Sequence, residues 1–158
     1  MRVPGGAPNL LAVRYWLLKT EPGEYAWDDL AREGTTAWTG VTNAQALGNL
    51  KSMSQGDRAV IYHSGEKRAV GVAEIVRPAY PGPQGEDSGV CVDVRAVGPL
   101  PAPVPLEAIK TEPTFEGSVL LRQGRLSVVP LSPAEWRDLE GLADVIARTG
   151  GLRRAKRF

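Results

Sequence analysis

The chain has 158 residues, of which 42% are hydrophobic and 23% are charged. This is the size and composition of one ordinary globular domain, so neither a disordered chain nor a coiled coil is expected. No apolar run approaches the roughly 20 residues that span a bilayer, so we expect no membrane partner. The single cysteine, Cys91, and the single histidine, His63, leave no residues for a disulfide framework or for a cysteine- or histidine-rich metal site. We therefore expect a cytoplasmic protein.

The net charge of +1 hides an uneven distribution along the chain. Lys and Arg number 19 against 18 Asp and Glu, and the last six residues, 153–158, hold four of the cations. Without these six residues, 15 Lys and Arg stand against 18 Asp and Glu, which is a net charge of −3. The sequence thus has a mildly acidic body and a short basic end, and it shows no evenly basic surface for non-specific binding of DNA. Any contact with nucleic acid would have to come from a local patch or a shaped pocket.

The first third of the chain is predicted to begin loosely and then to fold. Residues 1–13 are rich in glycine and proline and are read as a flexible arm. The aromatic and apolar run 14–19 predicts the first strand, and a short helix over 25–33 should follow it. Residues 35–42 show no helical period and include a glycine, so they predict a loop that carries Trp38.

The middle of the chain predicts one helix and then three consecutive strands. Asn43 is a good N-cap for a helix that reaches Met53, with an apolar stripe at spacings of three and four. The predicted strands cover 58–63, 68–79 and 90–100, with a hairpin turn at 64–67 and a polar loop at 80–89.

The last third contains the clearest local signal. After a short helix over 106–110, residues 125–131 predict a last strand, which Pro130 places at an edge of the sheet. Ser132 and Glu135 then form a capping box that opens a helix toward Arg148. This order of elements indicates an α+β fold built on a small, strongly bent sheet or barrel. We expect one domain over residues 14–148, followed by a basic tail over 149–158.

The common catalytic and cofactor-binding motifs are missing. The sequence contains no GxxxxGK[ST], GxGxxG, HExxH, CxxC or GxSxG pattern, so phosphate-loop hydrolysis, Rossmann cofactor binding, zinc chemistry and the nucleophile elbow lack their residues. We expect no cofactor, no metal and no catalytic group. The remaining candidates are aromatic and small polar residues at strand ends and in loops.

Several of these candidates have more than one interpretation. His63 and Ser64 could in principle serve acyl transfer, could line a ligand pocket, or could be structural, with a backbone carbonyl satisfying the histidine. Trp38 could cover the core or could form a stacking wall for a planar ligand. Asn43 could cap its helix or read the edge of a base. Arg125 could be an ordinary surface cation or a contact to a ligand.

Five segments, taken in order, resemble one family. They are YWLLKTEP at 15–22, WTGVTN at 38–43, YHS at 62–64, VDV at 92–94 and RLSVVPL at 125–131. Together they are similar to the EVE domain, and the resemblance covers about residues 14–142. It implies a PUA-like fold, a small mixed-sheet barrel with short flanking helices, related to the YTH readers of methylated adenine. It also implies a module that binds DNA or RNA and recognises a modified base.

The resemblance implies a role for each matching residue in a pocket for a flipped or unpaired base. Trp38 and Tyr62 would be the stacking surfaces, and polar side chains would contact the base edge. Lys19 and Arg125 would approach phosphate or sugar, while Leu126 and Ser127 would line the floor. The residues expected to supply the polar contacts are Thr20, Asn43, His63 and Ser64.

The sequence departs from the family pattern where cations are expected. Family members commonly carry Arg at the position of Thr42, Tyr at Ala44 and another Arg at Leu47, and the connector 80–89 is shorter here. The leading hypothesis is a non-enzymatic reader of a modified or unpaired base in DNA or RNA. The lost arginines and the acidic body favour an alternative, a sensor of a small planar ligand that uses the same pocket. A hydrolase built on His63 and Ser64 is the third hypothesis.

Overall fold

The computed structural model describes residues 13–82 and 89–150. The predicted arm at 1–13 and the predicted tail at 149–158 lie outside these ranges, apart from Val13, Thr149 and Gly150.

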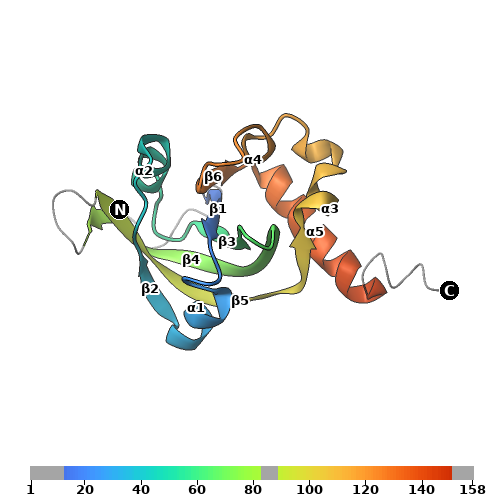
Figure 1. The fold of residues 1–158 in the computed structure, drawn as a ribbon, viewed down its shortest axis with the longest axis horizontal. Coiled ribbons are helices and arrows are strands. Elements are labelled where there is room, and N and C mark those ends of the chain that lie inside the picture. The colour runs from blue at the N-terminus through green and yellow to red at the C-terminus, as the bar shows by residue number, and fades with distance from the viewer. Residues whose placement is uncertain (1–12, 83–88, 151–158) are drawn as a thin grey trace, which may run out of the picture.

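One mixed sheet of six strands forms the centre of the described molecule (Figure 1). The strand order is β2-β5-β4-β3-β1-β6, and only the β1–β3 pair is parallel. The strands are β1 (Tyr15–Thr20), β2 (Thr35–Trp38), β3 (Arg58–His63), β4 (Arg68–Pro81), β5 (Val90–Pro105) and β6 (Val128–Leu131).

The helices cover the sheet and its ends. Figure 1 shows α2 and α5 at opposite ends of the view, with α5 beside the far end of β5. The helical segments are α1 (Trp27–Glu33), α2 (Ala44–Lys51), α3 (Leu106–Lys110), the short 3₁₀ turn η3 (Pro113–Phe115), α4 (Val119–Arg122) and α5 (Pro133–Thr149).

Local capping explains where three of the helices begin. The side chain of Asn43 accepts a hydrogen bond from the backbone N–H of Ala46, as predicted for an N-cap. The predicted capping box of α5 is present, with Ser132 and Glu135 each accepting from the other's backbone N–H at 3.0 and 2.9 Å. At α1 the carboxylate of Asp29 accepts from Ala26 N at 2.8 Å.

The core follows from the strand pattern. Five of the six residues in β3 are buried, as expected of a strand in the middle of a sheet with both faces covered. The first half of β4 alternates buried and partly exposed residues. Large side chains from β1, α1 and the η3 turn fill the interior, among them Trp16, Leu30 and Phe115.

The structure corrects the sequence prediction at four places. Residues 35–38 form the strand β2, which pairs antiparallel with β5, whereas the sequence predicted a loop. The strands β4 and β5 are longer than predicted, and β6 is shorter and begins at Val128. The edge position of β6 is confirmed. The sheet within the described residues bends through several register shifts between β4 and β5 but does not close into a barrel, because β2 and β6 pair on one side only.

Candidate functional site

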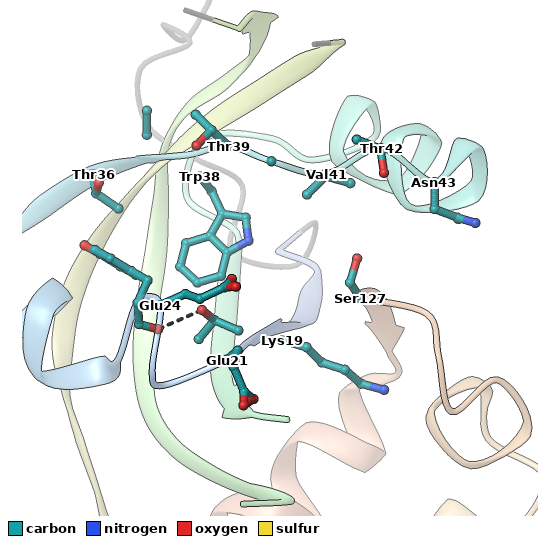
Figure 2. Close-up of a pocket in the computed structure, with 14 residues that line it drawn as sticks. Lys19, Glu21, Glu24, Thr36, Trp38, Thr39, Val41, Thr42, Asn43 and Ser127 are labelled. Carbon is teal, nitrogen blue, oxygen red and sulfur yellow. Dashed lines mark hydrogen bonds between the residues drawn. The ribbon is translucent and has the colours of Figure 1, made fainter. Parts of the chain in front are cut away.

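A cavity of about 440 Å³ opens where β1 and β2 end. We call it the main cavity (Figure 2). The loop 38–43 forms one wall, and the end of β1 with the turn 21–25 forms the other. The residues that line it are Lys19, Thr20, Glu21, Glu24, Tyr25, Thr36, Ala37, Trp38, Thr39, Gly40, Val41, Thr42, Asn43 and Ser127. The sheet therefore brings together two segments that are almost 20 residues apart in the chain.

Two aromatic rings form the apolar part of the main cavity. The rings of Tyr25 and Trp38 meet edge to face, with centroids 6.0 Å apart. Trp38 is only 7% exposed because it belongs to the hydrophobic core, and its indole is directed into the cavity (Figure 2). Burial, together with the hydrogen bond that Tyr25 Oη donates to Glu33 Oε1, raises the pKa of Tyr25 to about 12. The phenol is therefore neutral at physiological pH.

The turn after β1 places two carboxylates on the same cavity. The backbone N–H groups of Glu24 and Tyr25 donate to the carbonyl of Glu21, and Thr20 Oγ1 donates to the carbonyl of Tyr25 at 2.7 Å. Figure 2 shows Glu21 and Glu24 across the cavity from the loop that carries Thr39 and Val41, with the carboxylate of Glu21 directed away from Trp38. Glu21 also accepts from Gly65 N at 2.9 Å and from Ser64 Oγ at 3.2 Å. The β3–β4 turn thus holds the Glu21 carboxylate in place.

Lys19 connects the main cavity to the segment that precedes β6. Its backbone N–H donates to Ser127 O at 2.9 Å, and its ammonium group donates to Gly124 O at 2.7 Å. The ammonium also lies 5.7 Å from the centre of the Tyr62 ring, and burial lowers the pKa of Lys19. Figure 2 shows this amine directed away from Trp38. The cation is therefore held at the side of the cavity rather than in it.

The structure brings five of the ten predicted site residues together on the main cavity: Lys19, Thr20, Trp38, Asn43 and Ser127. A second cavity of about 360 Å³ is lined by Arg125 and Leu126, with Asn43 common to both cavities. The remaining three, Tyr62, His63 and Ser64, line neither of these two cavities.

Packing explains why these three residues lie elsewhere. Tyr62 is 4% exposed, since it sits in β3 beside Lys19 of β1. His63 Nε2 accepts the backbone N–H of Trp27 at 3.0 Å, and His63 Nδ1 lies 2.9 Å from Glu66 Oε1. Both ring nitrogens of His63 therefore have partners. The structural interpretation expected a backbone carbonyl as the partner, but the partners are a backbone N–H and a carboxylate. The Ser64 hydroxyl contacts Glu21 and Thr20 O, so no Ser–His pair forms among the described residues.

The sequence interpretation missed three important residues of the main cavity. Glu21, Glu24 and Tyr25 lie where the sequence predicted a break at 20–23 after the first strand and then the start of a short helix, and none of the three was among the predicted site residues. The signal was the Pro22-Gly23 pair, which indicates a tight turn directly after β1. A turn at that point returns the chain to the strand end and places the next side chains beside it.

The described residues contain neither a membrane-spanning helix nor a cluster of metal ligands. Over residues 13–82 and 89–150, no helix is long and apolar enough to cross a membrane. The same ranges contain no group of three or more His, Cys, Asp or Glu side chains that could hold a metal ion.

The open mixed sheet with short flanking helices defines an α+β protein of the PUA-like class, with its cavity at the strand ends. The model of the EVE domain family matches residues 14–142, and the chain belongs to that family.

Relatives and solved structures agree with this assignment. Chicken (Gallus gallus) thymocyte nuclear protein 1 is 30% identical over 168 aligned positions, which cover 84% of this chain and 69% of the relative. The NMR structure of a Rhodopseudomonas palustris protein superposes with a TM-score of 0.79 at 42% identity and covers 85% of this chain and 95% of that one. The crystal structure of the human THYN1 protein in complex with 5-methylcytosine-containing DNA has a TM-score of 0.73 at 29% identity, covering 83% and 98%.

A more distant neighbour shares the fold alone. The YTH domain of a Zygosaccharomyces rouxii protein superposes with a TM-score of 0.52 at 15% identity, over 84% of this chain and 87% of that one. The fold relationship to YTH domains that the sequence resemblance implied is thereby confirmed.

Proposed function

We propose that this protein is a non-catalytic nucleic-acid-binding module that takes a modified or unpaired base into the main cavity. The observation that carries the proposal is the cavity itself. Its volume of about 440 Å³ lies in the usual range for small-ligand sites. Its wall combines the Tyr25–Trp38 aromatic pair with a few polar groups, which is how single unstacked bases are recognised.

The relatives support the same class of ligand. Human THYN1, which shares the fold at 29% identity, was crystallised with DNA that contains 5-methylcytosine. We therefore take 5-methylcytosine as the first base to test here and residues 14–148 as the binding unit.

The polar groups of the main cavity suit the edge of a neutral base. The carboxylate of Glu24 can accept hydrogen bonds from an exocyclic amino group, as acidic side chains do from cytosine N4, whereas Glu21 already accepts from Ser64 and Gly65. Thr20 donates its hydroxyl proton to Tyr25 O, so in the absence of ligand it holds the turn together. Asn43 uses its side-chain oxygen as the N-cap of α2, which leaves its amide NH₂ to donate to a base.

The test is the affinity of Trp38 variants for DNA that carries one 5-methylcytosine. Stacking on an aromatic side chain contributes about 1–3 kcal/mol per base, so Trp38→Ala should weaken binding about 5- to 150-fold. Trp38→Phe, which keeps a ring, should lose less. Fluorescence anisotropy with labelled single-stranded and duplex DNA measures both.

A parallel measurement keeps this test decisive. Because Trp38 also belongs to the core, each variant is compared with the parent chain by thermal unfolding before its affinity is measured. A folded Trp38→Ala protein that binds every methylated and unmodified DNA as the parent does would show that the main cavity does not hold the base.

A second candidate function is a sensor of a small planar ligand in the same cavity. The observation that favours it is charge, since Glu21 and Glu24 are among the residues that line the main cavity, and Thr42 stands where family members commonly carry Arg. Carboxylates beside the cavity would repel a phosphate backbone but not a neutral heterocycle. Thermal shift with free nucleosides and bases tests this function, because a ligand of the native state raises its stability.

A further inference from the structure

A second cavity beside the first has the opposite electrostatic character. The first turn of α2 and the segment 122–126, which begins at the last residue of α4, line an open cavity of about 360 Å³. We call it the arginine cavity because Arg122 and Arg125 line it and no carboxylate does. The main cavity, by contrast, is lined by two carboxylates and one ammonium group.

The polar side chains of the arginine cavity can all donate hydrogen bonds to an anion. Arg122 Nε donates to Gly117 O at 2.8 Å, which fixes the side chain and leaves its terminal NH₂ groups available as donors. Neither Arg122 nor Arg125 forms an ion pair within residues 13–82 and 89–150. The amides of Gln45 and Gln123 add neutral donors. Guanidinium groups bind phosphate oxygens in a bidentate manner, which makes a phosphate the matching ligand.

The two cavities are adjacent. Asn43 lines both of them, and Ser127 of the main cavity directly follows Leu126 of the arginine cavity. The ammonium group of Lys19 holds the two walls together through its hydrogen bond to Gly124 O at 2.7 Å. A ligand with a neutral planar part and an attached anion could therefore occupy both cavities at once.

We infer that the arginine cavity binds the phosphodiester group next to the base held in the main cavity, with Arg122 and Arg125 as its anchors. The inference rests on the proposed function. Its consequence is a ligand class, a nucleotide within a strand rather than a free base or nucleoside. The resemblance already implied a phosphate or sugar contact for Arg125, and the structure adds Arg122 beside it in one cavity. This cavity would supply the cations that are missing at Thr42 and Leu47.

The experiment follows the two cavities separately by NMR of the full, ¹⁵N-labelled chain. The indole N–H signal of Trp38 reports the main cavity, and the Nε–H signals of Arg122 and Arg125 report the arginine cavity. The probes are 5-methyl-2′-deoxycytidine, its 3′- and 5′-monophosphates, a short single-stranded oligonucleotide with one 5-methylcytosine, and inorganic phosphate. The oligonucleotide should shift all three signals, and the nucleoside should shift the Trp38 signal alone.

The matched variants are Arg122→Gln, Arg125→Gln and the double variant, with Arg137→Gln on the exposed face of α5 as the control. The double variant should weaken oligonucleotide binding at least about tenfold, in line with the loss of hydrogen bonds to a charged group. It should leave nucleoside binding unchanged, and the control should bind both probes as the parent does.

Each outcome decides between the two assignments. If the oligonucleotide shifts Trp38 but neither arginine, or if the double variant binds it normally, the phosphate site is refuted and the base cavity stands. Arginine shifts without a Trp38 shift refute the base cavity and with it the pairing proposed here. No shift with any probe refutes both. If inorganic phosphate binds with the same affinity as the oligonucleotide, as judged from the arginine signals, the arginine cavity is a site for free anions and the inference is refuted.

Discussion

Asp57 is a buried carboxylate, 2% exposed, that accepts three hydrogen bonds. Its Oδ2 accepts from the indole N–H of Trp16 at 3.0 Å and from Ser54 N at 2.9 Å, and its Oδ1 accepts from Arg14 N at 3.2 Å. These bonds join the start of β1 to the turn before β3. The residue lies outside both cavities, so its role is in the fold rather than in binding.

Asp57→Ala should destabilise the protein strongly. The substitution leaves the indole N–H of Trp16 and two backbone N–H groups without their acceptor, and each buried unsatisfied group costs about 1–3 kcal/mol. We expect the free energy of unfolding to fall by about 3 kcal/mol or more, measured from urea transitions. Asp144→Ala, an exposed carboxylate on α5, is the control and should change it by less than about 0.5 kcal/mol. Equal, small losses in the two variants would contradict this role of Asp57.

At the scale of the elements, a pair of neighbouring carboxyl groups belongs to α5 and to the start of η3: Asp138 is in α5, and Glu112 is the N-cap of η3. Burial and the neighbouring carboxyl of Asp138 raise the pKa of Glu112. Oδ2 of Asp138 is buried and has no hydrogen-bond partner among the described residues. Two carboxylates in such a position repel each other when both are ionised, so a proton on the pair favours the folded state.

The pair predicts a pH dependence of stability with a definite sign. Because the pKa of Glu112 is higher in the folded than in the unfolded state, the folded state binds more protons between the two values. This contribution is fully present below the ordinary value of 4.5 and is lost as the pH rises through the folded-state pKa. Glu112→Gln should therefore be more stable than the parent at neutral pH, and the difference should shrink toward pH 4.5. Urea unfolding of both proteins across this range measures it, and a constant difference would contradict the pair.

Elements that depend on local signals could be predicted from the sequence, and those that depend on distant partners could not. The caps at Asn43 and Ser132 depend on residues only three positions away in the sequence, and both were predicted correctly. The strand β2 has only four residues, Thr-Thr-Ala-Trp, and is a strand because β5, more than 50 residues later in the chain, pairs with it. No local pattern could reveal that pairing.

The same distinction applies to the candidate site. Trp38, Asn43 and Ser127 were predicted from the family resemblance and do line the main cavity. The resemblance could not show that His63 accepts a hydrogen bond from Trp27 N, because the two residues are far apart in the sequence and meet only when α1 packs near the end of β3. Nor could it reveal Tyr25, which reaches the cavity through the turn 21–25.

At the scale of the whole molecule, charge limits how nucleic acid can be bound. The chain carries +1 overall, and −3 without its last six residues. Proteins that grip a backbone broadly neutralise many phosphates and release as many counterions. Here two arginines line one cavity, and two glutamates line the cavity beside it. The proposed function therefore involves only one or two phosphate contacts next to the base.

This design predicts a weak dependence of affinity on salt. For single strands the slope of log K against log salt concentration is about −0.7 per phosphate contact. One or two contacts predict a loss of about three- to sevenfold between about 50 and 200 mM salt, whereas 6–10 contacts to a single strand would lose roughly 300- to 20,000-fold. Anisotropy titrations with a single-stranded oligonucleotide that carries one 5-methylcytosine measure the slope, and 5-methyl-2′-deoxycytidine, which has no phosphate, gives the reference slope of zero. The Arg122→Gln/Arg125→Gln variant should approach that reference. A steep slope that survives the double substitution would show that cations elsewhere in the chain hold the strand.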